Sequence, residues 1–165
     1  MELVDQGRPL AFSFEDVLRY HGGGSPGGAA VAFKALEYAL PLLDAHAPCE
    51  RREIVIETAF GGPGARDAFE LLTRAVTGDR YRIDPQLARP ERGRALERFV
   101  FGFSYRGTHA TLLLRAGFVT DEFIDLARTE DRFEAQERRL DQLKRELAER
   151  VMRTAAHDVF EAVST

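Results

Sequence analysis

Glycine is concentrated in two short segments of this 165-residue chain, and each segment stands directly before a sequence with helical periodicity. Five of the 14 glycines lie in residues 22–28, and three more lie in residues 61–64. Glycine lets the backbone adopt left-handed conformations and approach other atoms closely. A helix start also presents unpaired N–H groups that attract a carboxylate or a phosphate. The chain must therefore build two unusual backbone sites, which serve either close helix packing or a ligand.

The overall composition narrows the classes of function. With 165 residues, of which 44% are hydrophobic, the chain can bury one core as a single domain. A net charge of −4 disfavours a nucleic-acid partner. The single cysteine, Cys49, excludes a disulfide framework and a cysteine-only zinc site. The most apolar stretch, residues 29–43, is interrupted by Lys34 and Glu37, and the amino terminus lacks a secretory signal. We therefore expect a cytoplasmic protein with no membrane partner.

Periodicity and capping residues predict both helices and strands. Ser13 and Asp16 have the spacing of a capping box at the start of the first helix. The segment Arg106-Gly107-Thr108 has the length and central glycine of a hairpin loop. The predicted elements are a helix at 12–20, a helix at 29–43 that ends or kinks near Pro41, a strand at 53–58, a helix at 65–77 that Gly78 stops, a short strand at 81–84, and hairpin strands at 96–105 and 109–119.

Residues 120–165 are predicted to form a helical extension of a core made by residues 1–119. Thr120 is a favourable N-cap, and apolar residues then recur at helical spacing. Unbroken, such a helix of about 43 residues would span about 65 Å, which exceeds the width of a domain of this size. We expect either a break near Thr129–Asp131 or a projecting helix that pairs with another chain.

Polar side chains accompany both glycine segments. His21 precedes the first segment, and imidazole suits proton transfer or metal binding. Ser25 lies within that segment, where Pro26 follows it, so it is equally a simple helix N-cap. Arg66 and Asp67 begin the helix after the second segment, where Arg66 could bind an anion and Asp67 could orient a histidine. Neither segment has the spacing of a phosphate-binding loop, so glycine packing remains the alternative.

The residues around both segments resemble the FmdE family of formylmethanofuran dehydrogenase proteins. The first block is FEDVLRYHGGGSPGGAAVAFKALEYAL, which is similar to the family's short helix, H-G-H-x-C-P-G motif and small-residue helix. The second block is IVIETAFGGPGARDAFELLTRAVTGDRYRID, which is similar to its strand, T-D-x-C-x-x-D-A stretch and helix. The resemblance covers roughly residues 12–119. It implies an α+β fold with a mixed, mostly antiparallel sheet packed against helices, a homodimer, and a transition-metal site made by the motif histidines and cysteines.

The departures from the family motif change the expected chemistry. His21 and Gly22 match the first motif, but Gly23 replaces its second histidine and Ser25 its cysteine. The cysteine of the second block is absent as well. Because thiolate and imidazole are the ligands that hold zinc or nickel, we expect the family's metal site to be lost, with His21 the one candidate ligand left. The added glycines would enlarge the space for a bulkier or anionic ligand.

These observations predict a small-molecule pocket where residues 21–28 and 58–67 meet. The preferred interpretation is a binding or accessory protein for an anionic ligand. The alternatives are an enzyme in which His21, oriented by Asp67, acts as a general acid or base, a metal-binding protein that uses His21 and carboxylates, and an interaction module whose long helix is the functional surface. The expected polar groups of the pocket are His21, Ser25 and Asp67, and its further ligand-binding residues are Gly22, Gly23, Gly24, Thr58, Gly61, Gly62 and Arg66.

Overall fold

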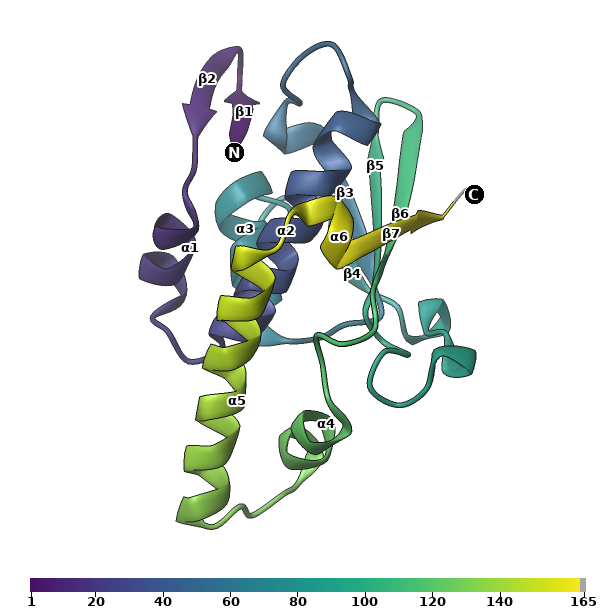
Figure 1. Cartoon of the computed structure of the whole chain (residues 1–165). Helices are drawn as coiled ribbons and strands as arrows, with labels where there is room; N and C mark the ends of the chain where they lie inside the picture. Colours follow the sequence, from purple (N-terminus) through teal and green to yellow (C-terminus); the bar gives the residue numbers. More distant parts are fainter. Residues whose placement is uncertain (164–165) are drawn as a thin grey trace.

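A five-stranded mixed sheet with helices packed on one face forms the centre of the molecule (Figure 1). A computed structural model describes residues 1–163. The strand order is β4-β3-β5-β6-β7, in which only β3 and β4 run parallel. The strands are β3 (Val55–Thr58), β4 (Tyr81–Ile83), β5 (Val100–Tyr105), β6 (Thr108–Leu114) and β7 (Phe160–Val163). The predicted α+β class and mostly antiparallel sheet are confirmed.

The first two helices begin where their caps place them. Helix α1 (Phe14–His21) has Ser13 as its N-cap, and the capping box with Asp16 is formed as predicted. Helix α2 (Pro26–Leu43) starts three residues earlier than predicted, because Pro26 suits the first helical turn. Pro41 lies inside its last turn, and the helix ends at Leu43, close to Pro41 as predicted. Helix α2 packs across β5 and β6 and also contacts α3 and α5.

Helix α3 (Pro63–Thr73) ends earlier than the sequence predicts. Its C-cap is Arg74 in a left-handed conformation, with φ of 55°, so Gly78 is not the helix stop. The physical reason is a set of contacts between side chains and backbone groups six or seven residues apart. Arg80 donates from Nη2 to the carbonyl oxygens of Thr73 and Arg74, at 3.0 Å each. The Glu70 carboxylate accepts hydrogen bonds from the backbone N–H groups of Val76 and Thr77. The backbone groups at the end of the helix are therefore satisfied without a glycine cap.

The predicted β5–β6 hairpin is present, with a tighter turn. Arg106 and Gly107 alone form the turn, and both have positive φ, as a two-residue hairpin turn requires. Thr108 pairs with Tyr105 and belongs to β6 instead of the loop. In β5, Phe101 and Phe103 face the helices and are buried, and their rings contact Phe69 of α3 at centroid distances of 6.2 and 5.8 Å.

The carboxyl-terminal segment is broken, and it ends in a strand. It forms α4 (Asp121–Arg128), α5 (Glu134–Arg153) and α6 (Ala156–Val159) before β7. The first break includes the predicted Thr129–Asp131, where Asp131 is left-handed and the Arg132 guanidinium donates to the carbonyls of Leu126 and Thr129. A helix to the chain end is wrong for residues 160–163, because these residues pair with β6 and bury Phe160 completely. The predicted core and extension therefore share one sheet.

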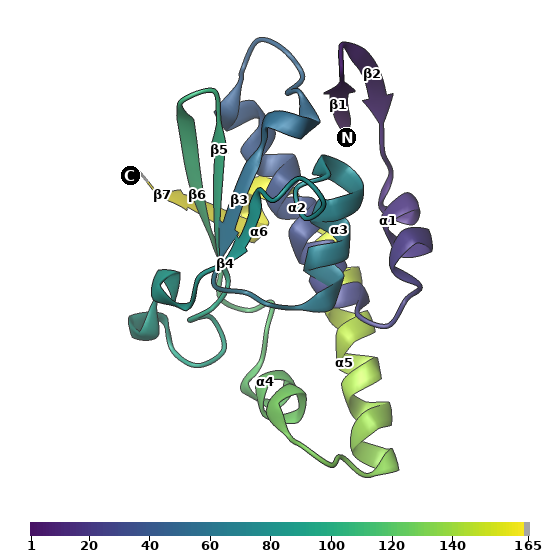
Figure 2. The same ribbon diagram turned by 180° about the vertical axis from the view of Figure 1, so that it is seen from behind.

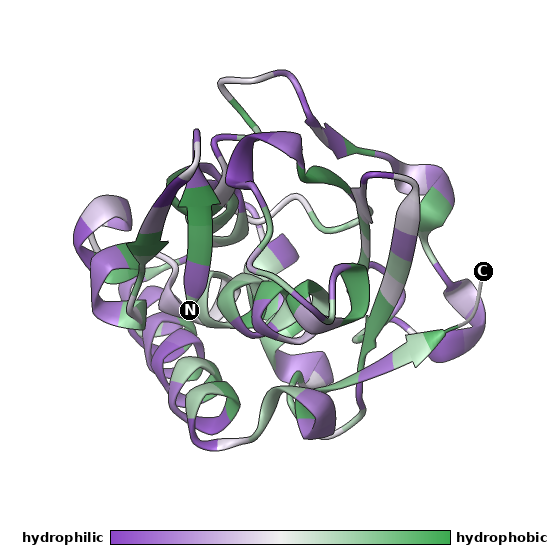
Figure 3. Cartoon of the chain, turned by 90° about the horizontal axis from the view of Figure 1, so that it is seen from above, coloured by the Kyte–Doolittle hydropathy of each residue, from purple (hydrophilic) through white to green (hydrophobic). Residues whose placement is uncertain are grey.

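Helix α4 and the amino-terminal half of α5 extend beyond the sheet, as views from opposite sides show (Figure 1 and Figure 2). Figure 3 shows hydrophobic residues gathered on α2 and on the strands that it faces. A hairpin that the sequence analysis did not predict, β1 (Glu2–Asp5) with β2 (Arg8–Ala11), lies above α1 in Figure 1, and β1 contacts the turn at residues 51–53. Three short 3₁₀ turns connect the other elements, at Arg51–Glu53, Pro85–Leu87 and Pro90–Arg92. Within residues 1–163, no helix is both long and apolar enough to cross a membrane.

Candidate functional site

The two glycine segments lie against each other, and His21 joins them. His21 ends α1, Ser25 is the N-cap of α2, and Asp67 is the fifth residue of α3, just after its first turn. The Nδ1 atom of His21 lies 2.8 Å from Oδ2 of Asp67. The Ser25 backbone N–H donates to Nε2 of the same ring, also at 2.8 Å. The neutral ring therefore carries its proton on Nδ1 and donates it to Asp67.

This arrangement limits what His21 can do. Its side chain is 7% exposed, and both ring nitrogens already have hydrogen-bond partners. The Nε2 lone pair becomes available to a proton or a metal only when the Ser25 N–H moves away. The geometry suits a positioned ring that ties α1, α2 and α3 together, and it becomes a base or an acid only after a local rearrangement.

The glycines at this junction differ in what they allow. A Cβ on Gly64 would lie 2.2 Å from the Ser25 carbonyl oxygen and 2.8 Å from the Ala29 nitrogen, so this glycine lets α3 pack directly on the start of α2. Gly22 and Gly23 have φ of +78° and +83° in open space, and they form the turn between α1 and α2. Gly62 packs against the Phe60 ring. Close packing thus explains part of the glycine content.

The other predicted residues of this junction are divided between the interior and the surface. Thr58 is buried, where its hydroxyl donates to the Val100 carbonyl at 2.6 Å. Arg66 is exposed and lies 3.4 Å from Asp67. Gly24 and Gly61 are exposed as well, and a Cβ on either would meet no atom closer than 3.6 Å. Whether these residues contact a ligand stays a prediction.

The residues present do not fit the transition-metal site that the family resemblance implies. His21 has Asp67 as its one carboxylate partner, and Ser25 offers a backbone N–H to the ring where the family motif has a thiolate. Over residues 1–163, no group of three histidine, cysteine, aspartate or glutamate side chains is arranged to hold a metal ion. Cys49 is buried away from the junction, and burial raises the pKa of its thiol to about 11.

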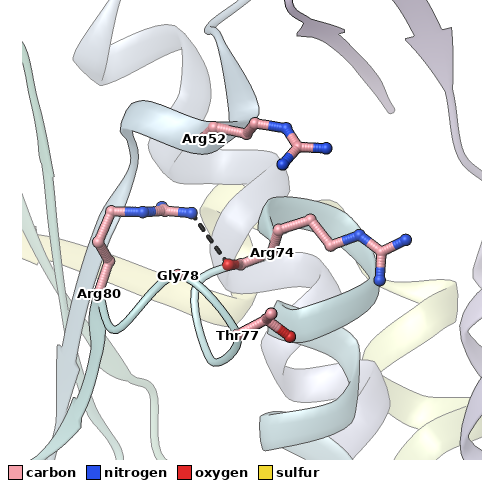
Figure 4. A pocket seen from close by; sticks show the side chains of 5 residues that line it. All are labelled: Arg52, Arg74, Thr77, Gly78 and Arg80. Carbon is pink, nitrogen blue, oxygen red and sulfur yellow. Dashed lines mark hydrogen bonds between the residues drawn. The ribbon is translucent and has the colours of Figure 1, made fainter.

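A second site lies at the opposite end of α3 and was missed by the sequence analysis. It is a hollow of about 460 Å³, here called the arginine pocket, which is lined by Arg52, Arg74, Thr77, Gly78 and Arg80 (Figure 4). These residues come from the turn before β3 and from the segment that joins α3 to β4. Along the chain, acidic residues stand between these arginines and balance their charges. Only the fold brings Arg52 to Arg74 and Arg80.

The three arginines of the pocket are held differently. Arg80 is fixed, because its guanidinium donates to the carbonyls of Ile54, Thr73 and Arg74, and burial lowers the pKa of this guanidinium. Arg52 donates from Nε to Asp5 at 2.5 Å, and its side chain is 48% exposed. Arg74 lies with Nη1 3.7 Å from the Glu70 carboxylate, which is a loose contact. The heads of Arg52 and Arg74 extend to the same side of the pocket (Figure 4).

The pocket carries more guanidinium groups than paired carboxylates. A fourth arginine, the buried Arg51, directly precedes the pocket residue Arg52 in the sequence. Its guanidinium group donates to the Leu71 carbonyl at 2.7 Å and lies 4.0 Å from the Asp5 carboxylate. A hydrogen bond from Arg52 lowers the pKa of Asp5, so that carboxylate is ionised at neutral pH. Three arginines, Arg51, Arg52 and Arg74, therefore share Asp5 and Glu70 as ion-pair partners, and Arg80 adds a fourth positive charge that forms no ion pair with the described residues. This excess of positive charge suits an anion.

Comparisons with known proteins leave the family open. No family model matches the chain, and no curated protein matches it. The resemblance to the FmdE family therefore stays a prediction. The groups available for chemistry are those of two sites, the histidine junction formed by His21, Ser25 and Asp67, and the arginine pocket.

Proposed function

We propose that this protein binds a small anionic ligand, and that the ligand occupies the arginine pocket. The observation that carries the proposal is the pair of half-exposed guanidinium groups, Arg52 and Arg74, that face one hollow beside the fixed charge of Arg80. The anionic ligand class is the one that the sequence predicts, whereas the place is new. A carboxylate or a phosphate matches the paired donors of a guanidinium group.

The donors left free in the pocket support this assignment. Arg52 uses Nε and Nη2 on Asp5, which leaves Nη1 without a hydrogen bond within residues 1–163. Arg74 makes no side-chain hydrogen bond to the described residues, because its contact with Glu70 at 3.7 Å is too long. Thr77 donates its hydroxyl proton to Glu70 and can then only accept. The ligand is therefore held by Arg52 and Arg74, while Arg80 contributes charge.

The test is a titration with inorganic phosphate and with citrate, followed by calorimetry and by backbone amide shifts. Arg74→Gln should weaken binding about 10-fold or more, since a hydrogen bond to a charged group contributes about 1.5–3 kcal/mol. The matched control is Arg66→Gln, an exposed arginine at the histidine junction. A loss of binding in Arg66→Gln with none in Arg74→Gln would move the ligand to the glycine segments. Equal binding in both variants would refute the proposal.

A second candidate function is catalysis at the histidine junction. The observation that favours it is the 2.8 Å contact between His21 and Asp67, which fixes the ring as a positioned acid or base requires. In this mechanism Ser25 withdraws its N–H and frees Nε2. Nitrogen NMR of the His21 ring tests it: a ring whose Nε2 stays hydrogen-bonded across a screen of small metabolites would argue against catalysis.

We propose further that the protein is a cytoplasmic homodimer of the FmdE type. The free, buried Cys49 favours a reducing compartment. Phe133, at the start of α5, is 65% exposed beside a hollow between α4 and α5 and is a candidate contact residue. Sedimentation should show a dimer for the native chain and a monomer for Phe133→Ser. A native monomer at high concentration would exclude this assembly.

A further inference from the structure

The central strand β5 contains a glycine that the backbone does not require. Gly102 lies in the middle of β5, and its φ is not in the left-handed region. The pairing of β5 with β3 and β6 continues through it without a bulge. A Cβ at this position would come no closer than 3.4 Å to the Glu57 carbonyl oxygen, which is an ordinary contact. Since glycine weakens a strand interior, its use here points to something that approaches the strand closely.

The missing side chain leaves a hollow on the sheet face opposite α2. The sheet-face hollow has a volume of about 210 Å³. Side chains alternate between the two faces of a strand, so Phe101 and Phe103 point to the core, whereas position 102 and its cross-strand neighbours belong to this opposite face. Register puts Glu57 of β3 on one side of Gly102 and Thr111 of β6 on the other. The polar side chains that line the hollow are Glu57, Ser104, His109 and Thr111, and its apolar lining includes Leu87 and Val100.

The polar groups of the hollow are ordered in a way that a ligand can use. The Ser104 hydroxyl and Nδ1 of His109 lie 2.8 Å apart, which fixes the imidazole ring across the strand pair. The other ring nitrogen, Nε2, has no hydrogen-bond partner within residues 1–163. The Glu57 carboxylate is about half exposed, and its ion-pair contact with Arg82 is long, at 3.8 Å. The Glu57 carboxylate, which accepts hydrogen bonds, therefore lies on one side of the flat backbone at Gly102, and the free Nε2 of His109 lies on the other.

We propose that the sheet-face hollow binds a planar nitrogen heterocycle of the size of a nucleobase, stacked on the backbone at Gly102. A flat ring can approach this floor closely because no Cβ intervenes. Its N–H groups donate to the Glu57 carboxylate, and its opposite edge meets His109 or Thr111. The small volume excludes drug-sized molecules, which need roughly 300–1,000 Å³. This site is separate from the arginine pocket, because the two share no lining residue.

The test is an amide-shift titration of the full chain with adenine and with cytosine, and with benzoate as a planar ligand that lacks ring nitrogens. The expected result is a saturable shift of the amides of Glu57, Gly102 and Thr111 with one or both bases and none with benzoate. Gly102→Ala should weaken this binding at least 10-fold without lowering the thermal midpoint, since alanine fits the space and the strand.

Glu57→Gln is the second variant, and it tests the proposal even if Gly102→Ala does not fold. Glu57 is exposed on β3, so the change should leave the fold intact while it removes the charged acceptor and weakens base binding about 10-fold. No shift at millimolar base, shifts confined to other parts of the protein, or unchanged affinity in both variants would each overturn the proposal.

Discussion

At the scale of single residues, Gly64 is the tightest point of the histidine junction. Gly64→Ala would push a methyl group into the backbone of α2 at Ser25 and Ala29, which cannot yield as a flexible side chain does. Overpacking of this kind costs about 1–3 kcal/mol, and we expect at least that loss in the free energy of unfolding measured with urea. Gly61→Ala is the matched control, because its nearest neighbour is a methyl group of Ile83 at 3.6 Å. Equal losses in both variants would contradict this explanation.

Cys49 provides a second residue-scale prediction. Burial is the main cause that raises the pKa of its thiol to about 11, and the nearby Asp44 carboxylate adds to the effect. The reactive thiolate is therefore scarce at neutral pH. We expect the native protein to react slowly with a thiol reagent such as Ellman's reagent and to react fast once it is unfolded in urea. Rapid stoichiometric labelling of the native protein would contradict the buried placement.

At the scale of elements, the carboxyl end of α3 depends on the Glu70 carboxylate. Burial would raise the pKa of Glu70, but the hydrogen bonds from Thr77 and Val76 outweigh it, so the net shift is downward from 4.5. A lowered pKa in the folded state contributes stability above about pH 4.5, which is lost as the pH falls through the folded value. Glu70→Gln should therefore be less stable than the native chain at neutral pH and should differ from it less in acid. Urea unfolding under both conditions measures this, and a gap that widens in acid would reverse the assignment.

The helices and strands also show which structural features can be predicted from the sequence. The capping box at Ser13 and the hairpin turn at Gly107 are local patterns, and both form nearly as predicted. The stop of α3 at Arg74 could not be predicted, because Arg80 and Glu70 replace the cap that Gly78 was expected to supply. Helical spacing likewise continues through residues 160–163, where pairing with β6 overrides it. Local patterns thus set most elements, and side-chain or strand partners beyond those patterns decide where the elements end.

At the scale of the whole molecule, the candidate sites also differ in whether local sequence patterns predict them or only the fold brings their residues together. The meeting of His21 with Asp67 was predictable from motif residues that flank both glycine segments. The arginine pocket was not, because Arg52 and Arg74 belong to separate elements and their charges look balanced when only sequence neighbours are considered. Gly102 was overlooked for a related reason: a single glycine in a strand gains meaning only when the register places Glu57 and Thr111 beside it.

The carboxyl-terminal segment gives the prediction for the molecule as a whole. Leu147 and Val151 of α5 and Phe160 of β7 are buried in the common core, and α5 packs along α2. Truncation after Arg128 would expose the α5-facing side of α2 and the edge of β6. Because three large apolar side chains leave the core and each contributes about 2–5 kcal/mol, the loss approaches the total stability of an ordinary domain.

We therefore expect the truncated chain to lose cooperative thermal unfolding and a dispersed amide spectrum. The control is Glu149→Gln in the full chain: the Glu149 side chain lies on the same segment and is 69% exposed, so this change should alter the free energy of unfolding by less than about 0.5 kcal/mol. A folded, cooperative truncated chain would show that α5 and β7 are additions to a self-sufficient core, and it would favour the interaction-module interpretation. Loss of folding would instead show that α5 and β7 are required for the sheet that carries the sheet-face hollow to fold.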